Sequence, residues 1–161
     1  MSLPQPEITL GPDDYLAWEQ DQPCRNEYVD GKVFAKGGAS DAHGTAAGNL
    51  AAFLHAALRG KPCRPFIADM KVHVETANSF FYPDIFVTCD PRDRAPEASH
   101  VKRHPVLIVE VLSPTTEACD RGNKFAAYRT LASLQEYVLV STEQRRVEVF
   151  RRDDTGHWVL Y

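Results

Sequence analysis

The chain has 161 residues, of which 43% are hydrophobic and 25% are charged, and its formal net charge is -4. This length and composition suit one globular domain with enough apolar residues for a core. The net negative charge argues against a protein that coats nucleic acid through bulk charge, although it allows a local basic groove. Neither a run of eighteen apolar residues nor a basic and apolar leader is visible, so we expect no membrane span and a cytoplasmic location.

The four cysteines lie roughly 26 to 39 residues apart and form no C-x-x-C pair. This spacing suits neither a zinc finger nor a compact disulfide scaffold. We therefore expect ordinary reduced thiols at Cys24, Cys63, Cys89 and Cys119.

The first half of the chain predicts two helices and a hairpin. "GPDDYLAWEQ" favours a short helix over about 12–21, because Pro12 stands near its start and acids fill the first turn. "NEYVDGKVFAKGG" alternates around an Asp-Gly dipeptide, which is typical of a two-residue hairpin. From Ser40 or Asp41, either of which is a competent N-cap, an Ala-rich segment predicts the longest helix, ending at Gly60.

The second half alternates strands with one helix. "PFIADMKVHVE" and "SFFYPDIFVT" favour an antiparallel pair, and the charged "CDPRDRAPEASHVKRHP" favours a loop. The apolar strand from Val106, the helix "CDRGNKFAAYRTLAS" and the strand "EYVLVS" indicate a parallel crossover, followed by "RRVEVFRR" and a last edge strand, "GHWVLY". This order predicts an α+β or mixed α/β domain with a mixed central sheet.

One carboxylate interrupts the apolar run "VLIVEVLSPTT". An unpaired ionised Glu110 inside a buried strand would cost several kcal/mol, so a metal ion, a basic side chain, a raised pKa or a strand end reaching water must compensate it. Asp84 is a second acid in an apolar and aromatic strand. Two acids on neighbouring strands, about 4.8 Å apart, can share one hard cation, and Mg²⁺ fits because it accepts one or two carboxylates and keeps several waters. A strand-end acid at Glu110 and a turn-capping Asp84 are the alternatives.

A basic partner is expected from the next helix. Lys124 lies fourteen residues after Glu110, where a crossover would fold it back over the sheet to position a water or to stabilise a pentavalent phosphate. The alternative is an exposed i, i+4 pair with Asp120. Tyr128 shares the face of Lys124 and is expected in the core. His43 begins the long helix, where its ring could face the same cleft or bond to the local backbone.

Several of these segments together resemble a known family. "NEYVDGKV", "YPDIFV" and "PVLIVEVLSPTTEACDRGNKFAAYRTLASLQEYVLVS" are similar to the Uma family of candidate endonucleases, and through it to the restriction-endonuclease-like PD-(D/E)XK nuclease superfamily. The resemblance covers roughly Thr9 to Phe150. Its most specific part is an ordered motif in which E-V-L-S-P-T-T is followed by an aspartate, a lysine and a tyrosine.

The resemblance implies a restriction-endonuclease-like fold and a metal-dependent site. Asp84 and Glu110 would be the ligands of Mg²⁺, with Mn²⁺ as a substitute, and DNA would be the substrate. The sequence departs from the superfamily pattern at Leu112, where a lysine is expected, and Lys124 is the matching candidate from the next helix. Glu27 resembles an additional upstream acid that completes such sites.

Three hypotheses follow from the sequence. The first is a Mg²⁺-dependent endonuclease whose catalytic residues are Glu27, Asp84, Glu110 and Lys124. The second is a nuclease-like domain that binds nucleic acid or a protein partner without cutting. The third is a homodimer that pairs through the "GHWVLY" edge. Two basic clusters could track phosphates or be ordinary solvated faces. They consist of Arg145, Arg146, Arg151 and Arg152, and of Arg92, Arg94, Lys102 and Arg103.

Overall fold

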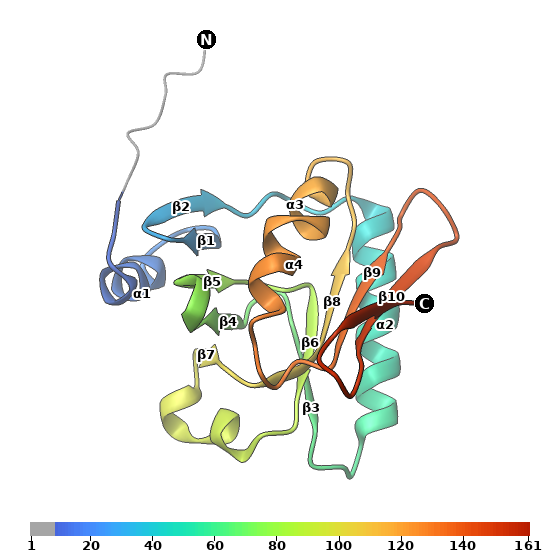
Figure 1. The fold of residues 1–161 in the computed structure, drawn as a ribbon. Coiled ribbons are helices and arrows are strands. Elements are labelled where there is room, and N and C mark those ends of the chain that lie inside the picture. Colours follow the sequence, from blue (N-terminus) through green and yellow to red (C-terminus); the bar gives the residue numbers. More distant parts are fainter. Residues whose placement is uncertain (1–8) are drawn as a thin grey trace.

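The computed structural model describes residues 9–161, which form two β-sheets and four α-helices (Figure 1). The helices are α1 (Pro12–Gln20), α2 (Asp41–Leu58), α3 (Glu117–Arg121) and α4 (Asn123–Tyr128), with the 3₁₀ helices η1 (Glu75–Ala77), η2 (Pro91–Arg94) and η3 (Pro96–Ala98). The strands are β1 (Asn26–Val29), β2 (Lys32–Ala35), β3 (Arg64–Ile67), β4 (Lys71–Val74), β5 (Ser79–Phe81), β6 (Ile85–Thr88), β7 (Val101–Lys102), β8 (Pro105–Val111), β9 (Glu136–Val140), β10 (Val147–Arg152) and β11 (Trp158–Leu160).

Both sheets are mixed. The five-stranded sheet has the order β2-β1-β5-β4-β7, and the six-stranded sheet has the order β11-β10-β9-β8-β6-β3. Strands β4 and β7 are parallel in the first, and β8 and β9 are parallel in the second. The predicted mixed α/β class is confirmed, and so is the parallel crossover from β8 through α3 and α4 to β9. The strands divide between two sheets, whereas the sequence suggested one central sheet.

Helices cover both faces of the six-stranded sheet. Because successive strand residues point to opposite faces, Phe86 and Ile108 pack with Phe125 of α4, whereas Ile85 and Val109 pack against the alanines and leucines of α2. The same alternation places Glu110, two residues after Ile108, on the α4 face. This register brings Glu110 to the helix that carries Lys124.

Local sequence signals account for the helix starts and the first hairpin. Pro12 occupies the first turn of α1, and the hydroxyl of Ser40 accepts the N–H of His43 at the start of α2. Asp30 and Gly31 both have positive φ, 44° and 92°, as a two-residue turn of this kind requires between β1 and β2. Within the described residues, no helix combines the length and the hydropathy needed to cross a bilayer.

Two predicted strands are each divided. "PFIADMKVHVE" forms β3 and β4, and "SFFYPDIFVT" forms β5 and β6, with a short link from Tyr82 to Asp84. The expected antiparallel pairing is present twice, because β4 pairs with β5 in one sheet and β3 with β6 in the other. The link that carries Asp84 therefore joins the two sheets. The predicted loop also contains η2, η3 and the two-residue strand β7.

The prediction for the cysteines is wrong at two positions. Cys63 directly precedes β3 and Cys89 directly follows β6, and the register of these strands pairs Arg64 with Thr88. The antiparallel ladder thus brings the two thiols face to face, and they form a disulfide. Cys24 and Cys119 are free, as predicted.

Candidate active site

Asp84 directly precedes β6, and Glu110 lies on the neighbouring strand β8, so the two carboxylates meet at one end of this strand pair. Ile85 pairs with Val109 across β6 and β8, so that Asp84 comes next to Glu110. The backbone N–H of Asp84 donates to Glu110 Oε2 at 3.3 Å, and the N–H of Val111 donates to Asp84 Oδ2 at 2.8 Å. Each carboxylate is thus anchored by the backbone of the other strand.

Glu110 has two further donors on α4. Lys124 Nζ lies 3.3 Å from Glu110 Oε1, and the hydroxyl of Tyr128 donates to the same oxygen at 3.2 Å. Glu110 is only 2% exposed, which makes these contacts essential for a polar group in this position. The acid in the apolar strand is therefore compensated by a lysine, a tyrosine and a backbone amide.

Lys124 is the centre of a ring of carboxylates. Besides Glu110, its Nζ lies 3.2 Å from Glu27 Oε1 on β1 and 3.5 Å from Asp120 Oδ1 on α3. Glu27 also accepts the backbone N–H of Tyr82 at 2.9 Å, which fixes it to the link before Asp84. The five-stranded sheet, the six-stranded sheet and the α3–α4 segment thus each contribute to one cluster.

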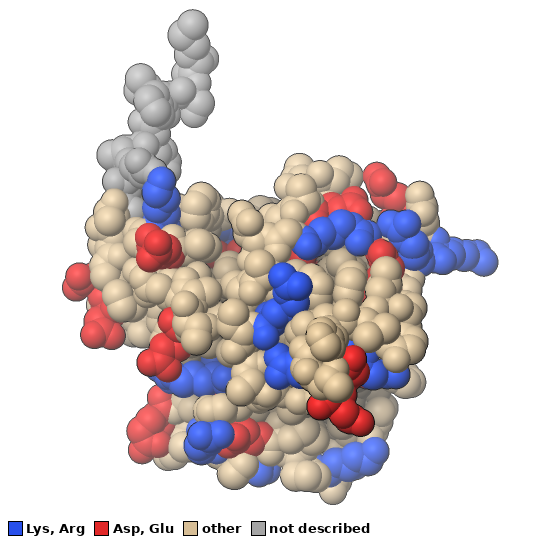
Figure 2. Space-filling view, viewed as in Figure 1, with Lys and Arg blue, Asp and Glu red and all other residues tan. Residues whose placement is uncertain are grey.

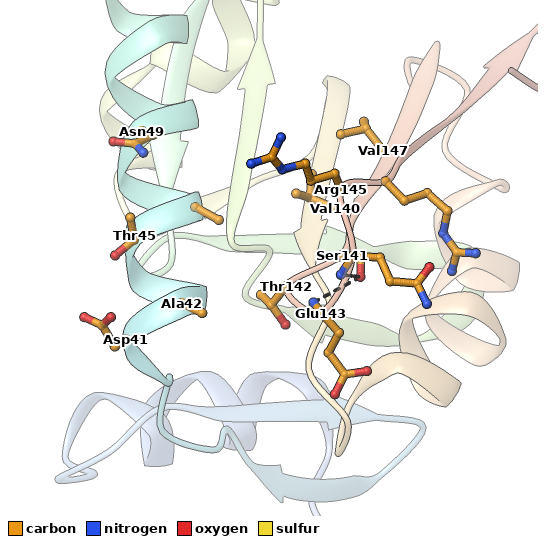
Figure 3. Close-up of a pocket in the computed structure, with 13 residues that line it drawn as sticks. Asp41, Ala42, Thr45, Asn49, Val140, Ser141, Thr142, Glu143, Arg145 and Val147 are labelled. Carbon is orange, nitrogen blue, oxygen red and sulfur yellow. Dashed lines mark hydrogen bonds between the residues drawn. The ribbon is translucent and has the colours of Figure 1, made fainter.

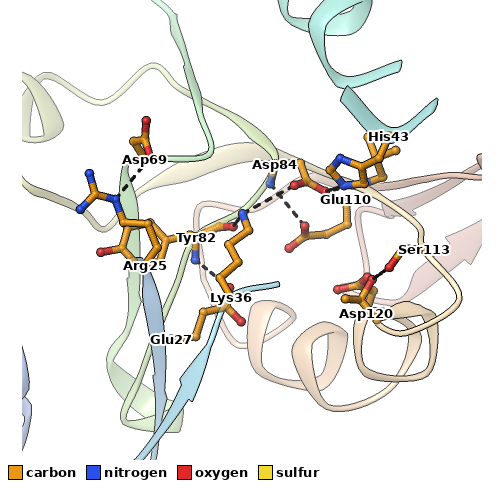
Figure 4. Close-up of polar contacts among 12 residues, drawn as sticks. Arg25, Glu27, Lys36, His43, Asp69, Tyr82, Asp84, Glu110, Ser113 and Asp120 are labelled. Carbon is orange, nitrogen blue, oxygen red and sulfur yellow. Dashed lines mark hydrogen bonds and ion pairs between the residues drawn. The ribbon is translucent and has the colours of Figure 1, made fainter. Parts of the chain in front are cut away.

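A histidine and a lysine also contact Asp84 (Figure 4). His43 Nε2 lies 3.1 Å from Asp84 Oδ2, and Lys36 Nζ lies 3.6 Å from Asp84 Oδ1 while it donates to the carbonyl of Tyr82 at 2.7 Å. His43 stands in the first turn of α2, which Ser40 caps. Both side chains restrain the carboxylate of Asp84.

Burial dominates the acid–base properties of the cluster. It raises the pKa of Glu110 to about 8 against the attraction of Lys124, with Asp84, Asp120 and Glu27 adding repulsion. Burial likewise raises the pKa of Asp120. Burial alone would lower the pKa of Lys124, but the negative charges of Glu110, Glu27 and Asp120 outweigh it and the pKa is raised. Lys124 is therefore a permanently charged ammonium, whereas Glu110 changes charge near neutrality.

Comparison with known proteins places the chain in a family. Residues 12–161 match the Uma2 family, which is described as "Putative restriction endonuclease". The chain belongs to the Uma2 family. Two Synechocystis proteins named as uncharacterized, slr1290 and sll1609, are 38% and 30% identical over 94% and 91% of this chain and 78% and 83% of their own lengths. A crystal structure from Anabaena variabilis, titled a putative nuclease belonging to DUF820, has a TM-score of 0.76 at 17% identity and covers 94% of this chain and 84% of that chain.

The Uma2 site contains all four side chains that the sequence predicted to act together. Glu27, Asp84, Glu110 and Lys124 lie within one connected set of contacts. Leu112 is buried in the core, so the position where the superfamily pattern expects lysine offers no cation.

The structure adds detail for four other residues of the cluster. The Asp120–Lys124 pair exists, but both side chains are buried in the cluster and do not form an exposed pair. The ring of His43 binds Asp84, while its backbone N–H is the group that bonds locally. Tyr128 is a core residue as expected and also bonds Glu110. Lys36 had no sequence signal, because it follows β2 in an irregular segment.

The donor set of the Uma2 site suits a hard cation. Within residues 9–161, no three His, Cys, Asp or Glu side chains converge as a ready-made metal cage. Four carboxylates nevertheless surround two ammonium groups, and Asp84 and Glu110 are directly adjacent. Mg²⁺ accepts one or two carboxylates and keeps several waters, so this pair fits it, whereas a zinc site requires three or four nitrogen, sulfur or oxygen ligands.

Two cavities are large enough for a ligand, and the first shares residues with the cluster. One, of about 660 Å³, is bounded by β1, β2 and β5 on one side and by α3 and α4 on the other, and both Glu27 and Lys124 line it. The other, of about 1010 Å³, lies between the first turns of α2 and the β9–β10 turn (Figure 3). Asp41, Thr45 and Asn49 form one of its walls, and the turn with Arg145 forms the opposite wall.

Most members of the two predicted basic clusters have internal partners. Arg151 pairs with Glu136, and Arg152 donates to three backbone carbonyls at the end of α4. Lys102 is buried and donates to two carbonyls, and Arg92 pairs with Asp90.

Positive and negative side chains are interspersed on the face shown in Figure 2. In the described part of the chain, Arg145 makes no ion pair, and it lines the cavity beside α2. A phosphate-tracking surface stays a prediction.

Proposed function

We propose that this Uma2 protein is a divalent-metal-dependent endonuclease that hydrolyses phosphodiester bonds of DNA. The contact of 3.3 Å between Lys124 Nζ and Glu110 Oε1 carries the proposal. It supports a site in which α4 supplies the lysine that the sequence lacks at Leu112. The family description and the fold shared with the Anabaena protein agree with this function.

Asp84 and Glu110 would hold Mg²⁺, with Mn²⁺ as a substitute. When bound, such an ion polarises a phosphate oxygen and lowers the pKa of a coordinated water. Burial favours the protonated form of Glu110, so Glu110 has to lose this proton before its carboxylate can bind the metal ion. The N–H of Val111 and the ring of His43 fix Asp84 Oδ2, whereas Asp84 Oδ1 faces Lys36 Nζ at 3.6 Å.

Lys124 supplies fixed positive charge at the reacting phosphate. Its ammonium does not titrate near neutrality, so it can stabilise the charge that develops on phosphate oxygens in the transition state. Glu27 and Asp120 hold Lys124 in place by ion pairs of 3.2 and 3.5 Å. Asp120 acts through Lys124 and is therefore a positioning residue.

The test is a cleavage assay on supercoiled, single-stranded and double-stranded DNA with Mg²⁺, Mn²⁺ or EDTA. We expect Asp84→Asn, Glu110→Gln and Lys124→Met each to lower the rate by at least about 100-fold, because the first two remove carboxylates that would hold the metal ion and the third removes positive charge aimed at the transition state. The matched controls are Glu97→Gln and Lys61→Met, two exposed residues outside the cluster. Circular dichroism establishes that every variant is folded. If folded Asp84→Asn protein cut as fast as the parent, the assignment of the site would be wrong.

Binding without cleavage is the second candidate. Glu110 already has three hydrogen-bond donors from the protein, so the cluster is satisfied by its own residues. This candidate requires that DNA binding weaken steeply with salt and be unaffected by Mg²⁺. A parent protein that binds in this way and cuts no DNA with either ion would favour it over the endonuclease.

A further inference from the structure

The cavity between the five-stranded sheet and α4 is continuous with the proposed catalytic cluster. Glu27 and Lys124 belong to both, and the stem of Lys124 passes over the ring of Phe81 with Nζ 5.7 Å from the ring centre. Phe34 lies directly opposite Glu27 in the β1–β2 ladder. A ligand in this cavity would therefore lie on the Lys124 side of the cluster.

The lining of the cavity is mostly apolar and carries a few neutral polar groups. Its aromatic residues are Phe81 and Phe34, of which Phe34 is 53% exposed although it stands on a strand. Its aliphatic surface includes Val29, Ala126 and Ala127. Within residues 9–161, the amide of Asn123 on the α4 wall makes no hydrogen bond, so both its donor and its acceptor are free. A flat aromatic ligand with polar edges matches this combination.

We propose that the cavity binds an unpaired base of the DNA strand whose phosphate lies at the catalytic cluster. The inference rests on the proposed function and specifies its substrate as single-stranded DNA or unpaired nucleotides within a duplex. A base inside a duplex is stacked and paired, so it can enter a pocket only after it has left the stack. The free-energy cost of this step is smallest for a base that is already unpaired. The ring of Phe34 stacks on the base, and Asn123 bonds its edge.

The charge distribution supports an unpaired substrate. Duplex binding depends on many phosphate contacts from lysine and arginine, but this chain has a net charge of -4 and uses Arg151, Arg152 and Lys102 internally. Base stacking on aromatic rings is the other main source of affinity for single strands. The exposed Phe34 beside a single fixed lysine fits that mode of binding.

The test measures binding in the Asp84→Asn background with Mg²⁺, so that no cleavage is needed. A fluorescent single-stranded oligonucleotide and its blunt duplex are titrated at constant salt. We expect tighter binding of the single strand. Phe34→Leu should weaken it at least about fivefold, because stacking on one ring contributes about 1 kcal/mol or more per base. Phe34→Tyr should retain it. The matched control is Phe53→Leu, which removes a ring 68% exposed on α2, and it should bind as the background protein does.

The outcomes separate the two proposals. Equal or tighter binding of the duplex, or unchanged single-strand binding by Phe34→Leu, overturns the base site. If the parent cuts DNA while Phe34→Leu binds normally, only the base site fails. If single-strand binding requires Phe34 but the parent cuts no DNA, the base site stands and the endonuclease fails.

Discussion

Replacing Glu110 with glutamine should make the fold more stable in alkaline solution while removing activity. Folded Glu110 keeps its proton up to a pKa of about 8, whereas in the unfolded chain the proton leaves near the ordinary value of 4.5. Between these values the folded state binds more protons than the unfolded state, so the free energy of unfolding falls as the pH rises. Glutamine is neutral in both states and is free of this penalty.

The size of the effect follows from the two pKa values. At about 1.36 kcal/mol per pH unit, the interval from 4.5 to about 8 corresponds to a loss of about 5 kcal/mol in the parent relative to Glu110→Gln, complete above pH 8. About 3 kcal/mol of this loss is expected by pH 7. Near pH 5 this effect should change the free energy of unfolding of the two proteins little, because Glu110 is then protonated in the folded state.

Urea unfolding at pH 5, 7 and 9 in EDTA measures the difference, with Glu97→Gln as the control. The control should show no pH-dependent difference from the parent, since Glu97 is exposed. A difference between the parent and Glu110→Gln that stays constant to within about 1 kcal/mol from pH 5 to pH 9 would refute the reasoning. It would mean that Lys124 keeps Glu110 ionised throughout.

Three further changes have defined outcomes. Tyr128→Phe removes the hydroxyl that donates to Glu110 and should lower the free energy of unfolding by about 1–2 kcal/mol in denaturant titrations, and an unchanged midpoint would contradict the contact. Ser40→Ala removes the N-cap of α2 and should cost about 1 kcal/mol in thermal unfolding, whereas Ser99→Ala, at an exposed position, should cost little. Cys63→Ser opens the disulfide that spans 26 residues and should cost about 3 kcal/mol. Dithiothreitol should then destabilise the parent but leave Cys63→Ser unaffected.

The local elements were readable from the sequence because their signals are local. Pro12, Ser40 and the Asp30–Gly31 turn mark positions where backbone geometry restricts the residue type, and the elements start and end near them. The division into two sheets was not readable in this way. Whether β3 continues into β4 or leaves for a different sheet depends on partners that are distant in sequence, and the alternation of side chains is the same in both cases.

The site was predictable where an acid interrupted an apolar run, as at Glu110 and Asp84. Lys124 followed from the crossover together with the family resemblance. Asp120 had a signal in its i, i+4 spacing to Lys124, but spacing does not show whether such a pair is buried. Lys36 had no sequence signal, because an irregular segment after β2 brings it to Asp84.

Some expectations depend on associations between distant segments or between molecules. The Cys63–Cys89 pair forms because two strands align, and a separation of 26 residues does not indicate this. One domain over the whole chain and a homodimer stay predictions. "GHWVLY" does contain the edge strand β11, with Val159 and Leu160 exposed, so light scattering at high protein concentration is a direct test of self-pairing.

The link from Tyr82 to Asp84 joins the two sheets, and this has a consequence during synthesis. Glu27 belongs to the sheet on one side of this link, Glu110 to the sheet on the other, and Lys124 to a helix made later than both. The cluster therefore forms only after the chain up to residue 124 has emerged and the sheets have docked. A nascent chain shorter than this has no complete set of catalytic groups, so under the proposed function the cell's DNA is not exposed to a partly made nuclease.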